Sequence, residues 1–133
     1  MNIDVPYGIT RRLVDTTLDN ARARVVSALA AEGFGVLTEI DVQKTLESKI
    51  GAKIEPYLIL GACNPGLAHR AIQNEPGIGL LLPCNVILTQ DGNDVVVSAA
   101  SPEAMFAIAR STPTTLAIAR EAQERLVRAL DAL

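Results

Sequence analysis

The side chains best suited to chemistry are gathered in one short stretch of the chain. Both cysteines, Cys63 and Cys84, and the single histidine, His69, lie between positions 63 and 84. An asparagine directly follows each cysteine, at Asn64 and Asn85. A thiol beside an imidazole can act as a nucleophile with its base, and thiolate and imidazole together can ligate a soft metal ion. This stretch is therefore the candidate functional site.

Three functional interpretations follow from these residue types. In a thiol site, Cys63 is the nucleophile or redox thiol, His69 the base and Cys84 the resolving partner. In a metal site, the two thiolates and the imidazole hold zinc or copper, although their spacing matches no standard zinc pattern. In a small-molecule pocket the same groups are polar lining, with Asn64 and Asn85 at the rim. The competing interpretation is structural: free cysteine is often a small buried apolar residue, and His69 then lies on a helix surface.

The predicted elements around this stretch decide whether the three side chains can meet. The continuous apolar run at 56–62 indicates a buried strand. Asn64 and Pro65 are typical of a helix start, and the helix is predicted to run to about Asn74, so His69 lies about one turn beyond the strand end. Strands are also predicted at 84–90 and 94–100, joined by a tight turn at 91–94. If strands 56–62 and 84–90 pair antiparallel, Cys63 and Cys84 come together.

The remaining pattern predicts a mixed fold. Strands are expected at 9–15 and 35–40 and helices at about 18–32 and 42–50, with two further helices starting at Pro102 and Pro113. Because the two strands joined at 91–94 break any strict strand–helix alternation, we expect an α+β fold with one mostly antiparallel sheet and helices mainly on one face. A doubly wound parallel sheet is the alternative, and it lacks a glycine fingerprint after the first strand. The whole of 1–133 is expected to form one domain.

Two further features are candidates for a role. Glu39 and Asp41 share strand parity, so paired carboxylates next to Lys44 and Lys49 could perform acid–base chemistry or hold a hard cation. The simpler interpretation is that Asp41 caps the helix at 42–50 and that the lysines face solvent. The loop at 77–83 lacks the lysine and Ser/Thr of a phosphate loop, so a flexible lid or an interface segment is the expectation. It holds three consecutive leucines, Leu80–Leu82, which would be exposed unless something covers them.

Composition excludes several classes of protein. The chain has 133 residues, a net charge of −3 and 3% aromatic residues. Without a basic stripe or stacking aromatics, nucleic-acid binding is not expected. No apolar run approaches the roughly 20 residues of a membrane span, and the start MNIDVPYGITRRL lacks the pattern of a signal peptide. We therefore expect a cytoplasmic protein with reduced, unpaired cysteines and no membrane partner.

Several stretches resemble a known family. The segment Tyr57–Pro65, YLILGACNP, is similar to the DUF302 family, a group of small domains of unknown function. Five further stretches resemble the family in the same order along the chain: Gly33–Val36, Glu39–Val42, Lys49–Gly51, Ala68-His69 and Leu82–Val86. The resemblance implies an α+β fold with a TATA-binding-protein-like outline and commonly a dimer. It implies no activity, and it keeps Asp41 and Lys49 among the candidate ligand-binding residues.

Taken together, the sequence favours a small ligand- or partner-binding domain with a pocket around Cys63, His69 and Cys84. The alternative is a thiol-dependent or metal-dependent enzyme that uses the same residues. The exposed leucines and the resemblance both favour a homodimer. Neither a cofactor nor a ligand is identified by the sequence.

Overall fold

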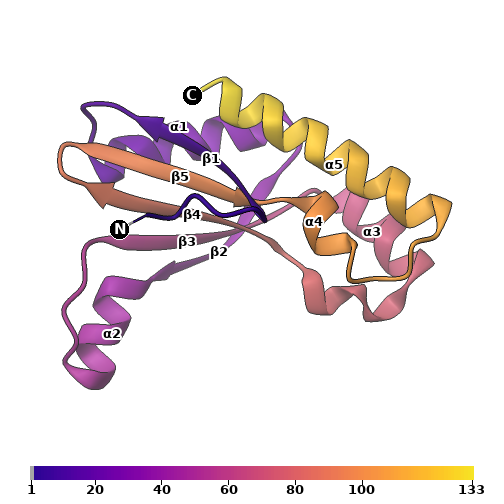
Figure 1. Cartoon of the computed structure of the whole chain (residues 1–133), viewed down its shortest axis with the longest axis horizontal. Coiled ribbons are helices and arrows are strands. Elements are labelled where there is room, and N and C mark those ends of the chain that lie inside the picture. Colours follow the sequence, from indigo (N-terminus) through magenta and orange to yellow (C-terminus); the bar gives the residue numbers. More distant parts are fainter. Residues whose placement is uncertain (1) are drawn as a thin grey trace.

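The computed structural model describes residues 2–133 and consists of one sheet with helices packed against it (Figure 1). The chain forms five strands, five α-helices and one 3₁₀ helix within these residues. In chain order the elements are β1 (Gly8–Leu13), α1 (Leu18–Ala31), β2 (Gly35–Asp41), α2 (Val42–Ile50), β3 (Tyr57–Cys63), α3 (Pro65–Asn74), η1 (Pro76–Leu81), β4 (Cys84–Asp91), β5 (Asp94–Ala100), α4 (Pro102–Phe106) and α5 (Pro113–Asp131).

All neighbouring strands in the sheet are antiparallel. The spatial order is β1-β5-β4-β3-β2, so the sheet is a meander from β2 through β5 in which β1 adds to the β5 edge. The α+β class and the antiparallel pairing of β3 with β4 are confirmed, and the parallel alternative is excluded. The expected elements lie within a few residues of the observed ones, and the loop after α3 forms η1. The TATA-binding-protein-like outline stays a prediction.

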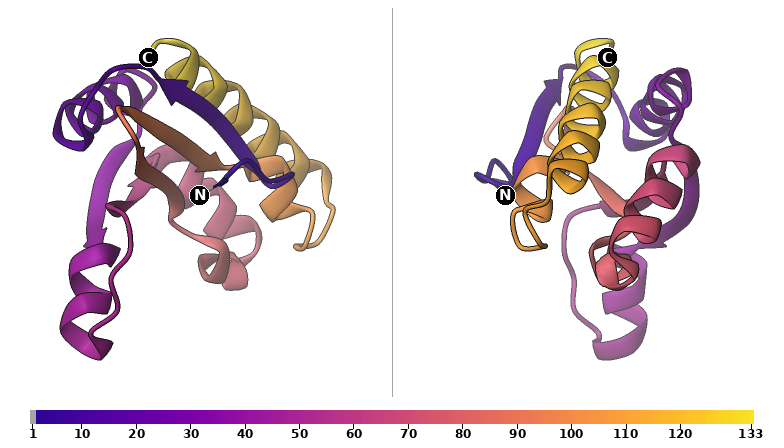
Figure 2. Two further views of the ribbon diagram at one scale, coloured as in Figure 1. Left: turned by 60° about the vertical axis from the view of Figure 1, so that its left-hand side comes forward. Right: turned by 90° about the vertical axis from the view of Figure 1, so that its right-hand side faces the viewer.

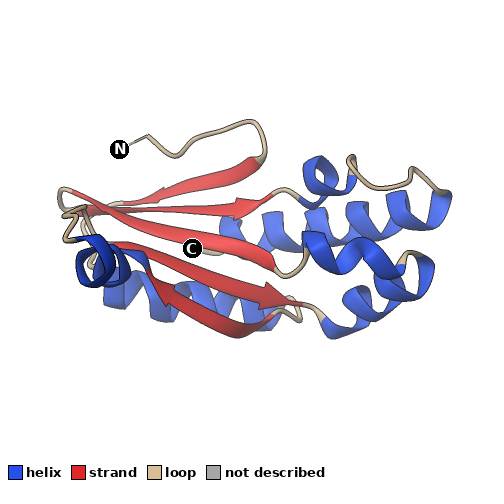
Figure 3. Ribbon diagram, turned by 90° about the horizontal axis from the view of Figure 1, so that it is seen from below, coloured by secondary structure: helices blue, strands red, loops and turns tan. Residues whose placement is uncertain are grey.

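The helices lie unevenly around the sheet. Helices α1 and α5 lie together on one face, which we call the covered face (Figures 1 and 3). In the described part of the chain no helix lies across the opposite, uncovered face, and α2 projects on that side from one end of the sheet (Figure 2). Helices α3 and α4, with η1 and the first half of α5, gather beyond the other end of the sheet. The candidate site lies at this second end.

Side-chain caps fix where the helices begin. The side chain of Thr17 accepts a hydrogen bond from the Asn20 amide at 3.3 Å, and Asp41 accepts one from the Lys44 amide at 2.9 Å. These bonds satisfy amide groups that have no partner within the helix. Helix α2 ends at Gly51, whose φ of 68° is accessible to glycine at little cost. Local sequence alone therefore defines both ends of α2.

The core is divided into two hydrophobic clusters. The first fills the covered face between the sheet, α1 and the second half of α5, and includes Leu29, Leu60, Leu88 and Leu126. The second lies beyond the sheet end and consists of residues from α3, η1, α4 and the first half of α5: Leu67, Ala71, Ile78, Phe106, Ile118, Ala119 and Ala122. Leu81 and Leu82 pack against this second cluster, so only Leu80 of the three leucines is strongly exposed, at 93%. Two of the three leucines that the sequence leaves exposed unless something covers them are thus covered by the second cluster of the same chain. A separate observation concerns membranes: each helix in residues 2–133 is too short or too polar to span a bilayer.

Candidate functional site

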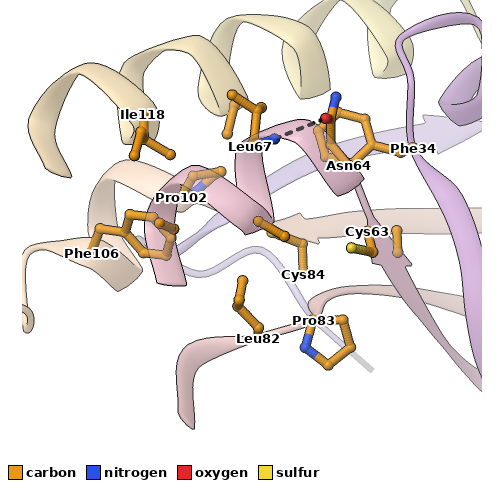
Figure 4. Close-up of a pocket in the computed structure, with 14 residues that line it drawn as sticks. Phe34, Cys63, Asn64, Leu67, Leu82, Pro83, Cys84, Pro102, Phe106 and Ile118 are labelled. Carbon is orange, nitrogen blue, oxygen red and sulfur yellow. Dashed lines mark hydrogen bonds between the residues drawn. The ribbon is translucent and has the colours of Figure 1, made fainter. Parts of the chain in front are cut away.

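A small cavity lies where the two hydrophobic clusters meet. It encloses about 30 Å³, and its lining combines the ends of β3 and β4 with α3, α4 and α5 (Figure 4). Phe34 and Ala62 from the first cluster form one side, and Leu67, Phe106 and Ile118 from the second form the other. The wall near the sheet end is completed by Cys63, Asn64, Leu82, Pro83 and Cys84. We call this space the junction cavity.

Strand register brings both cysteines to this cavity. In the β3–β4 pair Cys84 lies opposite Ala62, one residue before Cys63, and both cysteines are free. Cys84 is largely removed from water, and burial together with the nearby Cys63 raises the pKa of its thiol to about 11. A buried group avoids its charged form because the apolar interior solvates charge poorly. Cys84 is therefore a neutral thiol at neutral pH.

Asn64 joins two helices at the rim of the cavity. Its side-chain oxygen accepts a hydrogen bond from the Leu67 amide at 3.2 Å and so caps α3, as the sequence predicts. Its Nδ2 donates to the carbonyl of Glu32, just past α1, at 3.4 Å. Gly33 beside it has a φ of 84°, and a Cβ there would lie 2.9 Å from Asn64 Nδ2. A glycine is needed at this position for its backbone conformation and for the close approach of Asn64.

Gly61 allows the cavity wall to close over β3. A Cβ at Gly61 would overlap Thr38 Oγ1 and lie 3.0 Å from Pro83 Cγ. Only a residue without a side chain lets Pro83 and Thr38 both approach the strand. Pro83 directly follows Leu82 in the chain, and the Leu82 side chain packs against the second cluster. Gly61 therefore helps to fix the segment that links η1 to β4.

His69 and Asn85 lie away from the junction cavity. Helix α3 buries Leu67 and Ala71, which are four residues apart on one face, and His69 lies between them on the exposed side. A position two residues from Leu67 is rotated by about 200° around a helix, so the side chain points away from the sheet end. Asn85 is exposed and alternates with Cys84, which puts it on the uncovered face of the sheet. Of the five candidates, the cavity lining contains Cys63, Asn64 and Cys84.

The acidic and basic pair of candidates lies at the opposite end of the sheet. Asp41 pairs with Leu58, near the start of β3, and Lys49 is exposed on α2. Because β2 and β3 are antiparallel, the end of β2 is far along the strand from Cys63. Arg22 of α1 donates two hydrogen bonds to Glu39, at 2.8 and 2.6 Å, and these lower the pKa of that carboxyl. Glu39 is thus held in an ion pair, and Asp41 serves as a helix cap.

A metal centre is not assembled from these side chains. Within residues 2–133, no group of three or more His, Cys, Asp or Glu side chains lies close enough to hold a metal ion. With His69 on the outer side of α3, the set of Cys63, His69 and Cys84 does not form such a group. The metal interpretation therefore has no support in this structure.

What the arrangement offers chemically is an apolar space with thiol groups in its wall. Sequence analysis did not identify the apolar lining, which includes both phenylalanines of the chain, Phe34 and Phe106. One signal was available: in a chain with so few aromatic residues, each phenylalanine is a candidate for a special packing role. Such a space can take up uncharged groups and excludes ions.

Comparisons with known proteins agree on one family. A family model described as "Domain of unknown function DUF302" matches residues 10–133. The crystal structure of an uncharacterized conserved DUF302 protein from Bacillus stearothermophilus matches with a TM-score of 0.86 and 28% sequence identity. The match covers 96% of this chain and 98% of that one. Comparison with curated proteins gave no match.

Proposed function

The chain belongs to the DUF302 family, whose description names no activity, and we propose that it is a binding domain that takes a small uncharged, apolar group into the junction cavity. The observation that carries the proposal is the position of this cavity between two separately packed hydrophobic clusters. A boundary between two clusters is a place where the packing can open without breaking either of them. The ligand would then be covered by side chains from both.

The ionisation of the wall supports binding of a neutral group. With a pKa of about 11, the Cys84 thiol is almost entirely protonated at pH 7. In the thiol-dependent alternative the nucleophile is Cys63, and such a nucleophile is usually activated by a base in contact. His69, the base that the enzyme alternative requires, is not part of the cavity lining. The geometry therefore favours the binding domain over the thiol-dependent enzyme.

The size of the space limits what can enter without movement. A cavity of about 30 Å³ admits a group about as large as one water molecule or a methyl group. A larger ligand requires the wall at Leu82 and Pro83 to move, and Pro83 is already exposed at the surface. The ligand we propose is therefore a short apolar chain or ring that enters beside Pro83.

Methyl NMR with two apolar probes tests the proposal. Xenon reports on the cavity nearly as it stands, and benzene reports on an opened cavity. We expect both to shift the methyl signals of Leu67 and Ile118 saturably, while those of Leu60 in the first cluster stay unchanged. Saturable shifts of the Leu60 methyls that equal those at the cavity, or no saturable shift anywhere, would refute it.

A matched pair of variants on one helix makes this test specific. Ala122 is buried on α5 and lines the cavity, whereas Ala117 is exposed on the same helix. Ala122→Leu should fill the space and abolish the shifts, and Ala117→Leu should leave them as in the wild type. Shifts that survive Ala122→Leu unchanged would place binding elsewhere.

A further inference from the structure

The residues before β1 cross the uncovered face of the sheet. We call residues 2–7 the N-terminal strap, which runs along β4 toward α4 before the chain turns back into β1 (Figure 1). Ile3 in this strap is only 9% exposed. It lines one hollow together with Ile87 and another together with Val96. The strap therefore covers part of the face with an apolar side chain and leaves a hollow on either side of it.

Few hydrogen bonds hold the strap in place. Within the described part of the chain, the hydrogen bonds of residues 2–6 are local, and the last of them joins the Val5 carbonyl to the Gly8 amide at 3.0 Å. The first bond to a distant segment runs from the Ser101 amide to the Tyr7 carbonyl, at 2.8 Å. The strap before Tyr7 is thus held on the sheet mainly by apolar contacts, so it can lift without breaking a sheet hydrogen bond.

A hydroxyl without a partner lies beneath the strap. Thr89 of β4 is 2% exposed, and its Oγ1 has no hydrogen-bond partner within residues 2–133. It shares the uncovered face with Ile87, two residues before it, and its cross-strand neighbours are Tyr57 and Val96. Ile3 lines both the hollow that contains Tyr57 and the hollow that contains Val96. Its side chain therefore lies over Thr89, between the two.

The unpaired state of Thr89 sets it apart from the other buried hydroxyl beside it. Ser98, the cross-strand neighbour of Ile87, is 5% exposed, and its Oγ lies 2.8 Å from Thr10 Oγ1 in a hydrogen bond. A buried hydroxyl with no such partner lowers stability, because it has lost its hydrogen bonds to water and gained none. A ligand that supplies the missing partner would explain why a threonine stands at this position.

The hollow next to Thr89, which we call the tyrosine groove, has a lining suited to a neutral aromatic ring. It measures about 340 Å³, and Ile59 and Ile87 form its floor. It is bordered by Met105 and by Tyr7 and Tyr57, the two tyrosines of the chain. Aromatic rings pack well against other rings and against methionine sulfur. None of the described residues in this lining is charged, so the groove favours an uncharged molecule.

We propose that the tyrosine groove binds a phenol, a neutral aromatic ring with a hydroxyl group, and that Thr89 hydrogen-bonds to that hydroxyl when the strap lifts. Residues two apart on one face of a strand are separated by about 6.6 Å, so a ring over Ile87 can direct its hydroxyl into the space above Thr89. Ile3 fills this space while the strap is closed. Binding therefore exchanges the Ile3 side chain for the ligand hydroxyl.

The hollow on the other side of the strap does not favour an anionic ligand. Its two arginines are already paired: Arg11 with Asp131 at 2.7 Å, and Arg12 with Asp91 and Asp94 at 2.6 and 3.1 Å. A carboxylate or phosphate on the ligand would have to compete with these aspartates. The tyrosine groove and the junction cavity share no lining residue, so the two binding proposals can fail independently.

Methyl NMR with p-cresol and p-xylene tests the proposal. The two probes have nearly the same shape, but p-cresol carries a hydroxyl where p-xylene carries a methyl group. We expect p-cresol to shift the methyl signals of Ile3, Ile59 and Ile87 saturably, with a Kd of about 1 mM or tighter, as is usual for so small a ligand. Ile3 should respond because it leaves its place over Thr89.

Thr89→Val removes the hydroxyl and keeps the shape of the side chain. It should weaken p-cresol binding about tenfold and leave the affinity for p-xylene within about twofold of the wild type. Its melting temperature should rise, because an unpaired buried hydroxyl is replaced by an apolar group. Thr38→Val is the matched control, since Thr38 is exposed on β2 on the same face and outside the groove lining. It should change neither affinity.

Four outcomes would overturn the proposal. If p-cresol gives no saturable shift at Ile3, Ile59 and Ile87, the groove does not bind a phenol. If its shifts appear only at Leu67, the probe enters the junction cavity instead. Equal weakening of both probes in Thr89→Val would show that the hydroxyl does not contact the ligand. A lower melting temperature in Thr89→Val would show that the hydroxyl has a partner within the fold.

Discussion

Two rows of residues cross the sheet one residue apart along the strands, one through Leu60 and the other through Ile59. They lie on opposite faces, and their surroundings differ. In the Leu60 row the central side chains are fully buried under α1 and α5, and the charged residue at its β2 edge, Glu39, is paired with Arg22 of α1. In the Ile59 row three isoleucines face a side without helices. The covered face is packed under two helices, whereas the uncovered face is covered only in part, by the N-terminal segment around Ile3 and Val5.

This difference indicates which face of the sheet contributes most to the stability of the fold. Removal of an apolar side chain from the covered face leaves a cavity that the helices cannot refill, so the cost falls on folding. Truncation of Ile40 on the uncovered face, where the side chain is 47% exposed, removes a group that already contacts water. Its cost to folding should therefore be small, and measurements of unfolding can compare the two faces.

The largest effect is expected from Leu60→Ala. Leu60 has no exposed surface and lies at the centre of the first cluster. Its truncation should lower the free energy of unfolding by about 3–5 kcal/mol, from the lost transfer energy and the cavity that remains. Urea denaturation followed by circular dichroism measures this. A loss below about 1 kcal/mol would mean that the covered face is not close-packed around Leu60.

A smaller loss of stability is expected at high pH, where the thiol of Cys84 at the end of the covered face ionises. The Cys84 thiol has a pKa near 11 in the folded chain, against an ordinary value of 9.0. Well below pH 9 the thiol is neutral in both the folded and the unfolded chain, and its contribution to stability is fully present. Between pH 9 and 11 the unfolded chain ionises first, so stability should fall, by about 2–3 kcal/mol once the pH passes 11.

Comparison with Cys84→Ala isolates this effect from other groups that titrate at high pH. Its stability should fall less steeply than that of the wild type between pH 9 and 11. Alkylation offers a second measurement, since the thiolate fraction of Cys84 at pH 7 should be about a hundredfold below that of a free thiol. Parallel pH curves for the two proteins would show that Cys84 is not buried as described.

The two asparagines provide a matched test of intermediate size. Asn64 caps α3 and bonds to Glu32 beside the junction cavity, whereas Asn85 is exposed on the uncovered face. Asn64→Ala should cost about 1 kcal/mol of unfolding free energy through the lost cap. Asn85→Ala should stay within about 0.5 kcal/mol of the wild type. Thermal unfolding of the two variants side by side gives the comparison, and equal losses would contradict it.

The smallest effect on the monomer is expected from Ile40→Ala. At low protein concentration its unfolding free energy should differ from that of the wild type by less than about 1 kcal/mol, because Ile40 is half exposed. Urea denaturation of Ile40→Ala and Leu60→Ala, which lie in neighbouring rows of the same sheet, measures the difference between the two faces. A loss in Ile40→Ala as large as that in Leu60→Ala would remove the distinction between the faces.

The sequence by itself determined the elements and one end of the site. Helix caps at Asp41 and Asn64, the apolar run before Cys63 and the turn at 91–94 all act over a few residues, so their outcomes can be read locally. The tight turn also required β4 and β5 to be antiparallel neighbours. Whether Cys84 would lie beside the end of β3 depended on antiparallel pairing of β3 with β4, which the sequence left conditional and the structure shows.

Only the tertiary structure decided which side chains surround the cavity. His69 is close to Cys63 in sequence, but the burial of Leu67 and Ala71 sets the rotation of α3 and turns His69 outward. Phe34 and Phe106 come from opposite parts of the chain and meet the cysteines only because α4 and the start of β2 are packed at the same sheet end. Contacts between distant segments depend on how whole faces pack, and no local pattern encodes that choice.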